Sequence, residues 1–212
     1  MEIDLNRYKN IIFDLGGVIL NIDYNLSVDA FKKLGLENFQ THFSQAAQNE
    51  LFDLYEKGLI TSTDFRTELK KHLKDSISVT EIDNAWNALL QNLPAKRLTV
   101  LEQLKNTHRT FLLSNTNEIH INEFNSYLKT EFHINDLANH FEKMYLSYEI
   151  GMRKPDKEIF EFVISENNLQ PFETLFIDDS KQHIDSANSV GYKYLLVNKW
   201  GNNFRFVSIA NA

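Results

Sequence analysis

The spacing of hydrophobic and polar positions changes twice along the chain. A short apolar run, Ile11-Ile12-Phe13, stops at Asp14 and is followed by Gly16-Gly17 and a second apolar run, Val18-Ile19-Leu20. An apolar run that ends at an acid and two glycines predicts a buried strand followed by a tight turn. The first element expected is therefore a strand with a carboxylate at its carboxyl end.

Residues 25–92 show helical spacing and no convincing strand. Thr61 and Asp64 match a capping box at the start of one helix. Apolar residues recur at intervals of three and four along the segment, at Phe31, Leu34, Phe65, Leu69, Ile82, Trp86 and Leu89. The segment is therefore expected to be a helical unit, which ends before Pro94.

Residues 95–198 alternate between strand and helix patterns. The expected strands are Thr110–Ser114, Met144–Ser147, Thr174–Ile177 and Tyr194–Val197. Gly191 stands where a helix would end. Alternating strands and helices predict βαβ units and a mostly parallel sheet.

The order of these segments predicts an α/β fold. We expect a Rossmann-like, three-layer parallel sheet core made of residues 1–21 and 93–212. A helical cap, residues 22–92, is expected as an insertion after the first strand. In such open sheets, ligands bind beyond the carboxyl ends of the strands.

Composition narrows the class of protein. The 212 residues include no cysteine, which excludes disulfides, thiolate catalysis and a Cys-ligated zinc site. The net charge of −7 argues against nucleic-acid or anionic-membrane partners. Residues 1–7 lack the features of a signal peptide, and no apolar run reaches the roughly 18–20 residues that span a bilayer. We therefore expect a cytoplasmic protein; nothing in the sequence indicates an oligomeric state.

Polar residues stand at the ends of the expected strands: Asp14, Ser114-Asn115, Lys154 and Asp178-Asp179. Each has a local alternative, since Asp14 could cap a turn, Ser114 could cap a helix and Lys154 could be a solvated surface residue. The acid pair is harder to explain in this way, because it directly follows an apolar run where charge is costly without a cation. Together they predict a site at one edge of the sheet.

The residue types at this edge suit phosphoryl chemistry. Carboxylates can hold Mg²⁺, which typically takes one or two of them plus substrate phosphate. The metal and Lys154 would neutralise the oxygens of a phosphoryl group. A carboxylate could then attack phosphorus and form an acyl-phosphate.

Four motifs carry a resemblance to a known family. They are Phe13-Asp14-Leu15-Gly16-Gly17-Val18, Leu112-Leu113-Ser114-Asn115, Gly151-Met152-Arg153-Lys154-Pro155-Asp156 and Phe176-Ile177-Asp178-Asp179-Ser180. In this order they resemble the haloacid dehalogenase superfamily, in the subgroup with a helical cap. Within it, the chain is similar to bacterial sugar-phosphate phosphatases of the α-D-glucose-1-phosphate phosphatase kind and to the phosphatase half of soluble epoxide hydrolases.

The resemblance implies a Mg²⁺-dependent phosphatase that acts on a small phosphate ester, such as a hexose 1-phosphate. Asp14 would be the nucleophile and a metal ligand. The carbonyl of Gly16 and the carboxylate of Asp179 would complete the metal site, with Asp178 beside them.

The same resemblance assigns the phosphate-binding groups. Ser114 and the backbone of Asn115 would hold phosphate oxygens. Lys154 would bridge the nucleophile and the phosphate.

Gly16 departs from the family pattern, because that position usually carries an aspartate that acts as general acid and base. Loss of a general acid and base typically lowers the rate about 10²–10⁴-fold. The sugar-phosphate phosphatases that this chain resembles also have glycine at this position. Asp23 or a cap residue could substitute. His183 is a second departure, where the motif often continues with Asp or Asn, and it puts one contact around the site in question.

Gly16 also keeps three other functions open. The chain could be a dehalogenase, which would leave Asp178-Asp179 without a metal to bind. It could be a phosphonate hydrolase, which needs a Schiff-base lysine from the cap such as Lys57 or Lys70. It could also be a non-catalytic protein that binds a phosphometabolite.

Overall fold

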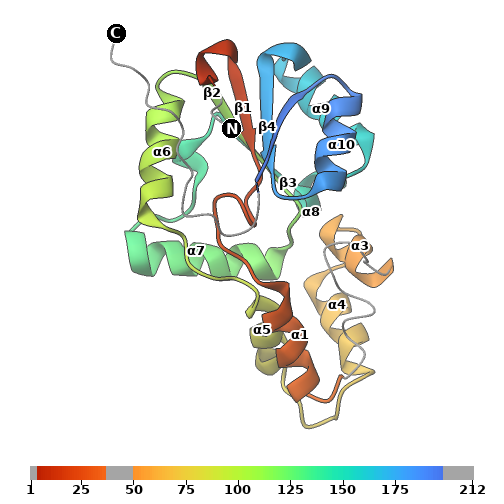
Figure 1. Cartoon of the computed structure of the whole chain (residues 1–212). Coiled ribbons are helices and arrows are strands. Elements are labelled where there is room, and N and C mark those ends of the chain that lie inside the picture. The colour runs from red at the N-terminus through yellow and green to blue at the C-terminus, as the bar shows by residue number, and fades with distance from the viewer. Residues whose placement is uncertain (1–3, 37–49, 198–212) are drawn as a thin grey trace.

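A five-stranded parallel sheet forms the centre of the protein (Figure 1). The computed structural model describes residues 4–36 and 50–197. The strands lie in the order β3-β2-β1-β4-β5. Their bounds are β1 Asn10–Phe13, β2 Arg109–Ser114, β3 Lys143–Leu146, β4 Thr174–Asp178 and β5 Lys193–Leu196. Every expected strand is confirmed, with each end within one residue of its predicted position.

Two layers of helices cover the sheet. α6 (Ala95–Lys105) and α7 (Glu118–Phe132) pack on one face, and α9 (Lys157–Asn167) and α10 (Lys181–Ser189) pack on the other (Figure 1). Alternate strand residues supply the two cores, so that Ile11 and Phe13 face one layer while Ile12 faces the other. Gly191 follows the end of α10 with φ +97°, as the sequence predicts. The three-layer Rossmann-like core is therefore confirmed.

Short elements complete this core. They are the helical turns η1 Leu5–Arg7, η2 Ala138–His140 and η3 Pro171–Glu173, and the four-residue helix α8 Ser147–Ile150. Ser147 belongs to α8 and not to β3, because its carbonyl accepts the helical hydrogen bond from the amide of Gly151 at 3.0 Å.

The strand register brings the polar strand ends to one edge. Phe13 pairs with Leu112 on one side and with Ile177 on the other. The amide of Asp14 continues this ladder by donating to the carbonyl of Ile177 at 2.9 Å. Asp14 and Asp178 therefore leave adjacent strands at the same level, beside Ser114 at the end of β2.

A helical cap lies beyond the carboxyl ends of the strands (Figure 1). Its described helices are α1 Tyr24–Lys33, α3 Glu50–Glu56, α4 Ser62–Lys70 and α5 Val79–Asn87. Its own aromatic core contains Phe52, Phe65 and Trp86, whose ring centroids lie 5.0–5.7 Å apart. The predicted Thr61–Asp64 capping box is present at the start of α4. Residues 37–49 of the expected helical segment lie outside the described residues.

Two chain segments run side by side where the cap joins the core. The amide of Asn21 donates to the carbonyl of Asn92 at 3.1 Å, and the amide of Gln91 donates back to Asn21 at 2.9 Å. Ile22 and Leu90 form an antiparallel bridge between the same segments. In the described ranges, no helix is long and apolar enough to cross a membrane.

Candidate active site

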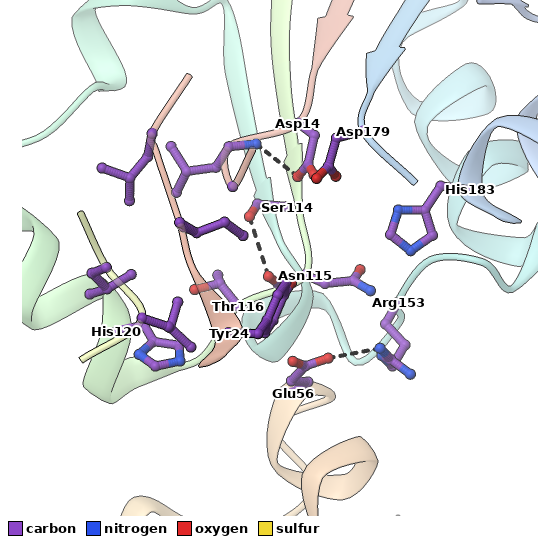
Figure 2. A pocket seen from close by; sticks show the side chains of 16 residues that line it. Asp14, Tyr24, Glu56, Ser114, Asn115, Thr116, His120, Arg153, Asp179 and His183 are labelled. Carbon is purple, nitrogen blue, oxygen red and sulfur yellow. Dashed lines mark hydrogen bonds and ion pairs between the residues drawn. The ribbon is translucent and has the colours of Figure 1, made fainter. Parts of the chain in front are cut away.

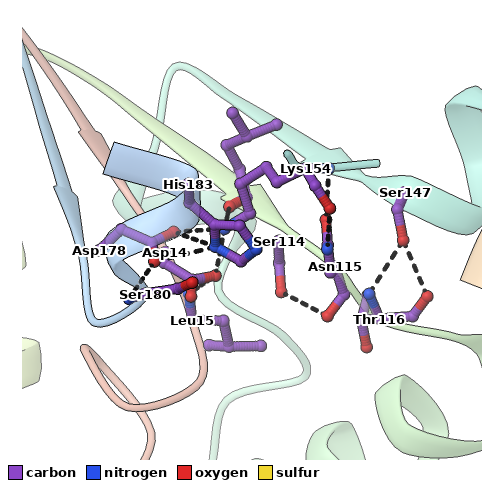
Figure 3. Close-up of polar contacts among 11 residues, drawn as sticks. Asp14, Leu15, Ser114, Asn115, Thr116, Ser147, Lys154, Asp178, Ser180 and His183 are labelled. Atoms are coloured by element: carbon purple, nitrogen blue, oxygen red, sulfur yellow. Dashed lines mark hydrogen bonds and ion pairs between the residues drawn. The ribbon is translucent and has the colours of Figure 1, made fainter. Parts of the chain in front are cut away.

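Three predicted residues meet in one buried ion cluster at the edge of the sheet (Figure 3). Nζ of Lys154 lies 2.8 Å from Oδ1 of Asp14 and 2.8 Å from Oδ2 of Asp178. The Lys154 side chain is fully buried, which contradicts a solvated surface role. It also donates to the carbonyl of Leu113 at 2.8 Å, so the ammonium has three fixed acceptors.

The cluster perturbs the protonation of its members. Burial raises the pKa of Asp14 to about 8; Lys154 acts in the opposite direction, and the nearby Asp178 and Asp179 add to the increase. Burial would also raise the pKa of Asp178, but Lys154 and His183 outweigh it and lower that pKa to about 2. Burial alone would lower the pKa of Lys154, but Asp14 and Asp178 more than offset it and raise the value. Lys154 is therefore a permanent cation.

Several polar groups fix the Asp178 carboxylate. Its Oδ1 accepts from the amide of Ser180 at 2.7 Å, and Nδ1 of His183 lies 3.0 Å from both of its oxygens. His183 therefore contacts the Asp178 carboxylate directly. Because these partners fix the Asp178 carboxylate, Asp178 is well placed to hold the Lys154 ammonium in position.

Asp179 and Asp14 face the cleft together (Figure 2). The Asp179 carboxylate packs against the turn after Asp14, where a Cβ added to Gly17 would lie 2.3 Å from Oδ2 of Asp179. Gly17 also has φ +76°, so both its backbone and its surroundings require glycine. Asp14 is oriented by the amide of Leu15, which donates to its Oδ1 at 2.7 Å.

This donor set fits a divalent cation. Asp14 and Asp179 supply two carboxylates at the cleft, while the Asp178 carboxylate beside them is bonded to Lys154, Ser180 and His183. Gly16 lines the same cleft, next to Asp14. Burial chiefly, and Asp178 and Asp179 in addition, raise the pKa of Asp14, and a hard cation with oxygen ligands would favour its ionised form. A tighter group of Asp14, Asp178 and His183 also has metal-ligand spacing, but there Asp178 and His183 already bond each other.

The loop after β2 is fixed to the lysine motif. The Asn115 side chain accepts from the amide of Lys154 at 2.9 Å and donates to its carbonyl at 2.7 Å. Ser147 bonds both the amide and the carbonyl of Thr116. Ser114 is not the cap of α7, because Asn117 takes that role by accepting from the amide of His120. The Ser114 hydroxyl therefore lines the cleft in a rigid loop.

Core and cap line the cleft together (Figure 2). The residues are Asp14, Leu15, Gly16, Leu20, Ile22, Tyr24, Glu56, Leu89, Leu90, Ser114, Asn115, Thr116, His120, Arg153, Asp179 and His183. Arg153 and Glu56 join core and cap by an ion pair of 2.9 Å. Burial raises the pKa of Tyr24 well above its usual value, and Asp179, Glu56 and Asp14 add to this effect. The Tyr24 phenol is therefore neutral and lies near carboxylates of both parts.

Two sequence-based candidates from the cap occupy other positions. Asp23 accepts from the amide of Asn25 at 3.0 Å and is the N-cap of α1, not a lining residue of the described cleft. Lys57 pairs with Asp53 at 3.1 Å and with Asp156 at 3.2 Å. Burial lowers the pKa of Lys57, but these acids outweigh it and raise the value. Lys70 is exposed, and neither Lys57 nor Lys70 is among the described residues that line this cleft.

Sequence reasoning assigned no role to four polar lining residues: Tyr24, Glu56, Thr116 and His120. Arg153 stands in a recognised motif but received no role. His120 follows Asn117 at helical spacing, which places it one turn beyond the phosphate-binding loop, and this signal could have found it. Glu56 had no such signal, because its partner Arg153 is far away in the sequence.

Comparison with known proteins gives concordant matches. The family model described as haloacid dehalogenase-like hydrolase matches residues 11–197. D-ribitol-5-phosphate phosphatase of Bacteroides thetaiotaomicron is 34% identical over 190 residues, which cover 87% of this chain and 89% of that protein. A crystal structure of a family enzyme from the same organism, an Asp-to-Ala mutant in complex with magnesium and inorganic phosphate, has a TM-score of 0.85 at 34% identity. It covers 93% of this chain and 97% of that chain.

A second solved structure has the same architecture. It is a predicted HAD-like family hydrolase from Porphyromonas gingivalis, with a TM-score of 0.83 at 28% identity. The match covers 92% of this chain and 94% of that chain. The extent of these matches shows that the similarity includes core and cap alike.

Proposed function

Because the chain belongs to the haloacid dehalogenase-like hydrolase family, we propose that it is a Mg²⁺-dependent phosphatase of small phosphate esters that works through an aspartyl-phosphate at Asp14. The observation that carries the proposal is the buried Asp14–Lys154–Asp178 cluster, which opens with Asp179 onto a cleft beneath the cap. The magnesium and phosphate bound to the similar Bacteroides enzyme support the choice of metal and of substrate group.

The proposed reaction has two displacements at phosphorus. The Asp14 carboxylate attacks phosphorus, the ester P–O bond breaks, and the leaving oxygen takes a proton from water as the alcohol departs. Water then attacks the phosphorus of the aspartyl-phosphate, which releases inorganic phosphate and restores Asp14. Magnesium, when bound by Asp14, Asp179 and the carbonyl of Gly16, supplies positive charge that offsets the phosphoryl oxygens.

The protein's own residues hold the phosphoryl group in this proposal. Lys154 faces Asp14 and would contact a phosphoryl oxygen during transfer. Ser114 and the Asn115 backbone would bind the remaining oxygens from the loop that Asn115 and Ser147 fix in place. Asp178 would act as a positioning residue that keeps the ammonium directed at Asp14.

Sugar phosphates are the proposed substrate class. A hexose 1-phosphate suits a site without an acid at Gly16, because a leaving oxygen of lower pKa needs less protonation. The activity named for the ribitol-phosphate relative brings open-chain polyol phosphates into the same class. The Tyr24 phenol and the cap-side polar groups would contact the leaving group.

The rival functions have less support at this site. A phosphonate hydrolase would need a cap lysine with a lowered pKa, but the pKa of Lys57 is raised and its ammonium pairs with two acids. A dehalogenase would have no metal for the Asp179 carboxylate to bind. A binding protein would not need a carboxylate of raised pKa in contact with Lys154.

The proposal includes the expected organisation of the chain. Residues 1–21 and 93–212 would form the catalytic core, and residues 22–92 the cap. The paired segments at Asn21 and Asn92 and the separate aromatic core around Trp86 support this division. A cytoplasmic location, with no nucleic-acid or membrane partner, belongs to the same proposal.

A phosphate-release assay tests this function. The full chain with p-nitrophenyl phosphate should be active with Mg²⁺, inactive after chelation and inactive as Asp14→Asn, which keeps the side-chain shape but removes the nucleophilic charge. Asp23→Asn is the matched control, since asparagine also caps helices and should keep near-normal activity. Robust turnover by Asp14→Asn would show that water attacks phosphorus directly and would refute the covalent route.

A further inference from the structure

His120 stands in the first turn of α7, just beyond the loop that carries Ser114. Asn117 begins this helix and accepts from the amide of His120 at 3.1 Å. The side chain is 8% exposed and lines the cleft together with Thr116 and Tyr24 (Figure 2). His120 therefore borders the same cleft as Ser114 and Asn115, which would hold the phosphate.

The cap fixes the orientation of the His120 ring. The indole of Trp86 stacks on it, with ring centroids 4.8 Å apart and an interplanar angle of 12°. Nδ1 lies 2.8 Å from Oδ1 of Asn87, at the end of the same cap helix. Because an amide oxygen only accepts, Nδ1 carries the proton and Nε2 presents a lone pair. The hydrogen bonds found among the described residues leave Nε2 without a donor.

Burial determines what this nitrogen can bind. It lowers the pKa of His120 to about 3, so the ring is neutral at physiological pH. A neutral ring that already donates through Nδ1 cannot attract a phosphate as a cation, but it can accept a hydrogen bond through Nε2. The surrounding wall combines Leu89 and Leu90 with the Thr116 hydroxyl. Such a wall suits a carbon chain that carries hydroxyl groups.

We propose that His120 is a specificity-determining residue, whose Nε2 accepts a hydrogen bond from a hydroxyl on the leaving group of a sugar or polyol phosphate. This inference rests on the proposed function, which it deepens by stating what the cleft recognises besides phosphate. Trp86 and Asn87 act as positioning residues, because they set the ring plane and the tautomer. Closure of the cap therefore completes the hydroxyl-binding site.

A paired substrate comparison tests the role. His120→Phe keeps a ring against Trp86 but removes Nε2. It should lower kcat/KM for D-ribitol 5-phosphate or glucose 1-phosphate by about 10–100-fold, because the hydroxyl would lose its partner in the closed cleft. The main effect should fall on KM, and phenyl phosphate, which has no hydroxyl, should change by less than about threefold. The control is His140→Phe, a buried histidine outside the described cleft, which should affect both substrates equally and little.

Binding measurements separate this inference from the proposed function. Calorimetric titration in Mg²⁺ compares Asp14→Asn with Asp14→Asn/His120→Phe, using D-ribitol 5-phosphate and phenyl phosphate as probes. Weaker binding of the polyol phosphate alone supports His120, even if the wild-type chain turns over no ester and the phosphatase proposal fails. Equal losses for both probes, or no loss for either, would overturn the specificity role.

Discussion

Nζ of Lys154 lies 2.8 Å from Oδ1 of Asp14, and both side chains are buried. The same ammonium touches Asp178, so one cation serves two carboxylates. Removal of this cation leaves both acids buried without their shared partner. Lys154 therefore contributes both to the fold and to the chemistry of the site.

Lys154→Met should abolish turnover and weaken the fold. We expect at least about a 10²-fold loss in kcat, because a preorganised charge at the phosphoryl group is lost. The free energy of unfolding should fall by about 3–5 kcal/mol, as for other buried pairs that lose one partner. Denaturant unfolding and steady-state kinetics measure the two effects.

Lys143→Met is the control for this change, because it removes an exposed lysine that pairs with Glu166. Its effect on stability should stay below about 1 kcal/mol, with normal activity. Similar stability losses in the two variants would contradict a structural role for the buried ammonium.

The pH dependence of stability should reveal the titration of Asp14. Its pKa in the folded protein is raised from 3.8 to about 8, so the folded state keeps a proton that the unfolded chain has lost. The stabilisation from this group is complete below pH 3.8 and disappears as the pH rises through about 8. The metal-free melting temperature should therefore fall as the pH is raised from 5 towards 8.5.

Magnesium should stabilise the protein more strongly as the pH rises. It needs the ionised carboxylate, so its stabilisation should grow over the same pH range in which the metal-free protein weakens. Thermal melts with Mg²⁺ and with a chelator measure this difference, and Asp14→Asn, which cannot titrate at this position, should remove most of it. A Mg²⁺ effect that is independent of pH would contradict the raised pKa.

The strands and the site residues could be predicted because their signals are local. Apolar runs give the buried strands, and the polar residue directly after each run marks the edge where ligands bind. Asp14, Ser114 and Asp178 were found in this way, and the register of three adjacent strands brings them together. Lys154 lies in a loop, and its burial was not predictable from its own neighbours.

The cap side of the cleft could not be predicted in the same way. Glu56 meets Arg153, and His120 meets Asn87, only because the cap takes one orientation over the sheet. No spacing within a segment encodes that orientation. Asp23, in contrast, has a local explanation. As the N-cap of α1 it accepts from a backbone amide of the first turn, and this contact explains its position without a role in proton transfer.

Gly16 should make turnover depend on the leaving group. Without a side chain to donate a proton there, phosphates at sugar C1 and aryl phosphates should react faster than primary alkyl phosphates. A series of esters with leaving groups of different pKa measures this slope. A flat series would show that another residue, such as Tyr24 in the cleft wall, assists the leaving oxygen.

Gly16→Asp should flatten that slope. Gly16 lacks a left-handed φ, but an added Cβ would lie 2.9 Å from Cδ1 of Ile22. That atom ends a flexible side chain, so Ile22→Val in the same protein should relieve the crowding. Ile22→Val alone is the control and should keep the wild-type slope. An unchanged slope in the folded double variant would show that a carboxylate at this position cannot reach the leaving oxygen.

The packing of the cap against the core should depend on Gly58, which follows α3 and faces α8 of the core. Its φ is +64°, and an added Cβ would lie 2.0 Å from the carbonyl oxygen of Tyr148. Gly58→Ala must therefore push the end of α3 away from the core. The ion pairs of Glu56 with Arg153 and of Lys57 with Asp156 lie beside this contact and should open with it.

Gly35→Ala separates this collision from simple backbone strain. Gly35 also lies in the cap with a left-handed φ of +99°, but nothing stands within 4 Å of its added Cβ. In both variants the free energy of unfolding should fall by about 1–2 kcal/mol, because alanine is strained in the left-handed backbone. Only Gly58→Ala should lower kcat/KM, by at least about 10-fold, because a displaced cap no longer shapes the cleft. Kinetics with a polyol phosphate, together with small-angle scattering to detect cap opening, measure the difference. Equal kinetic effects would mean that the contact between Gly58 and Tyr148 does not control closure.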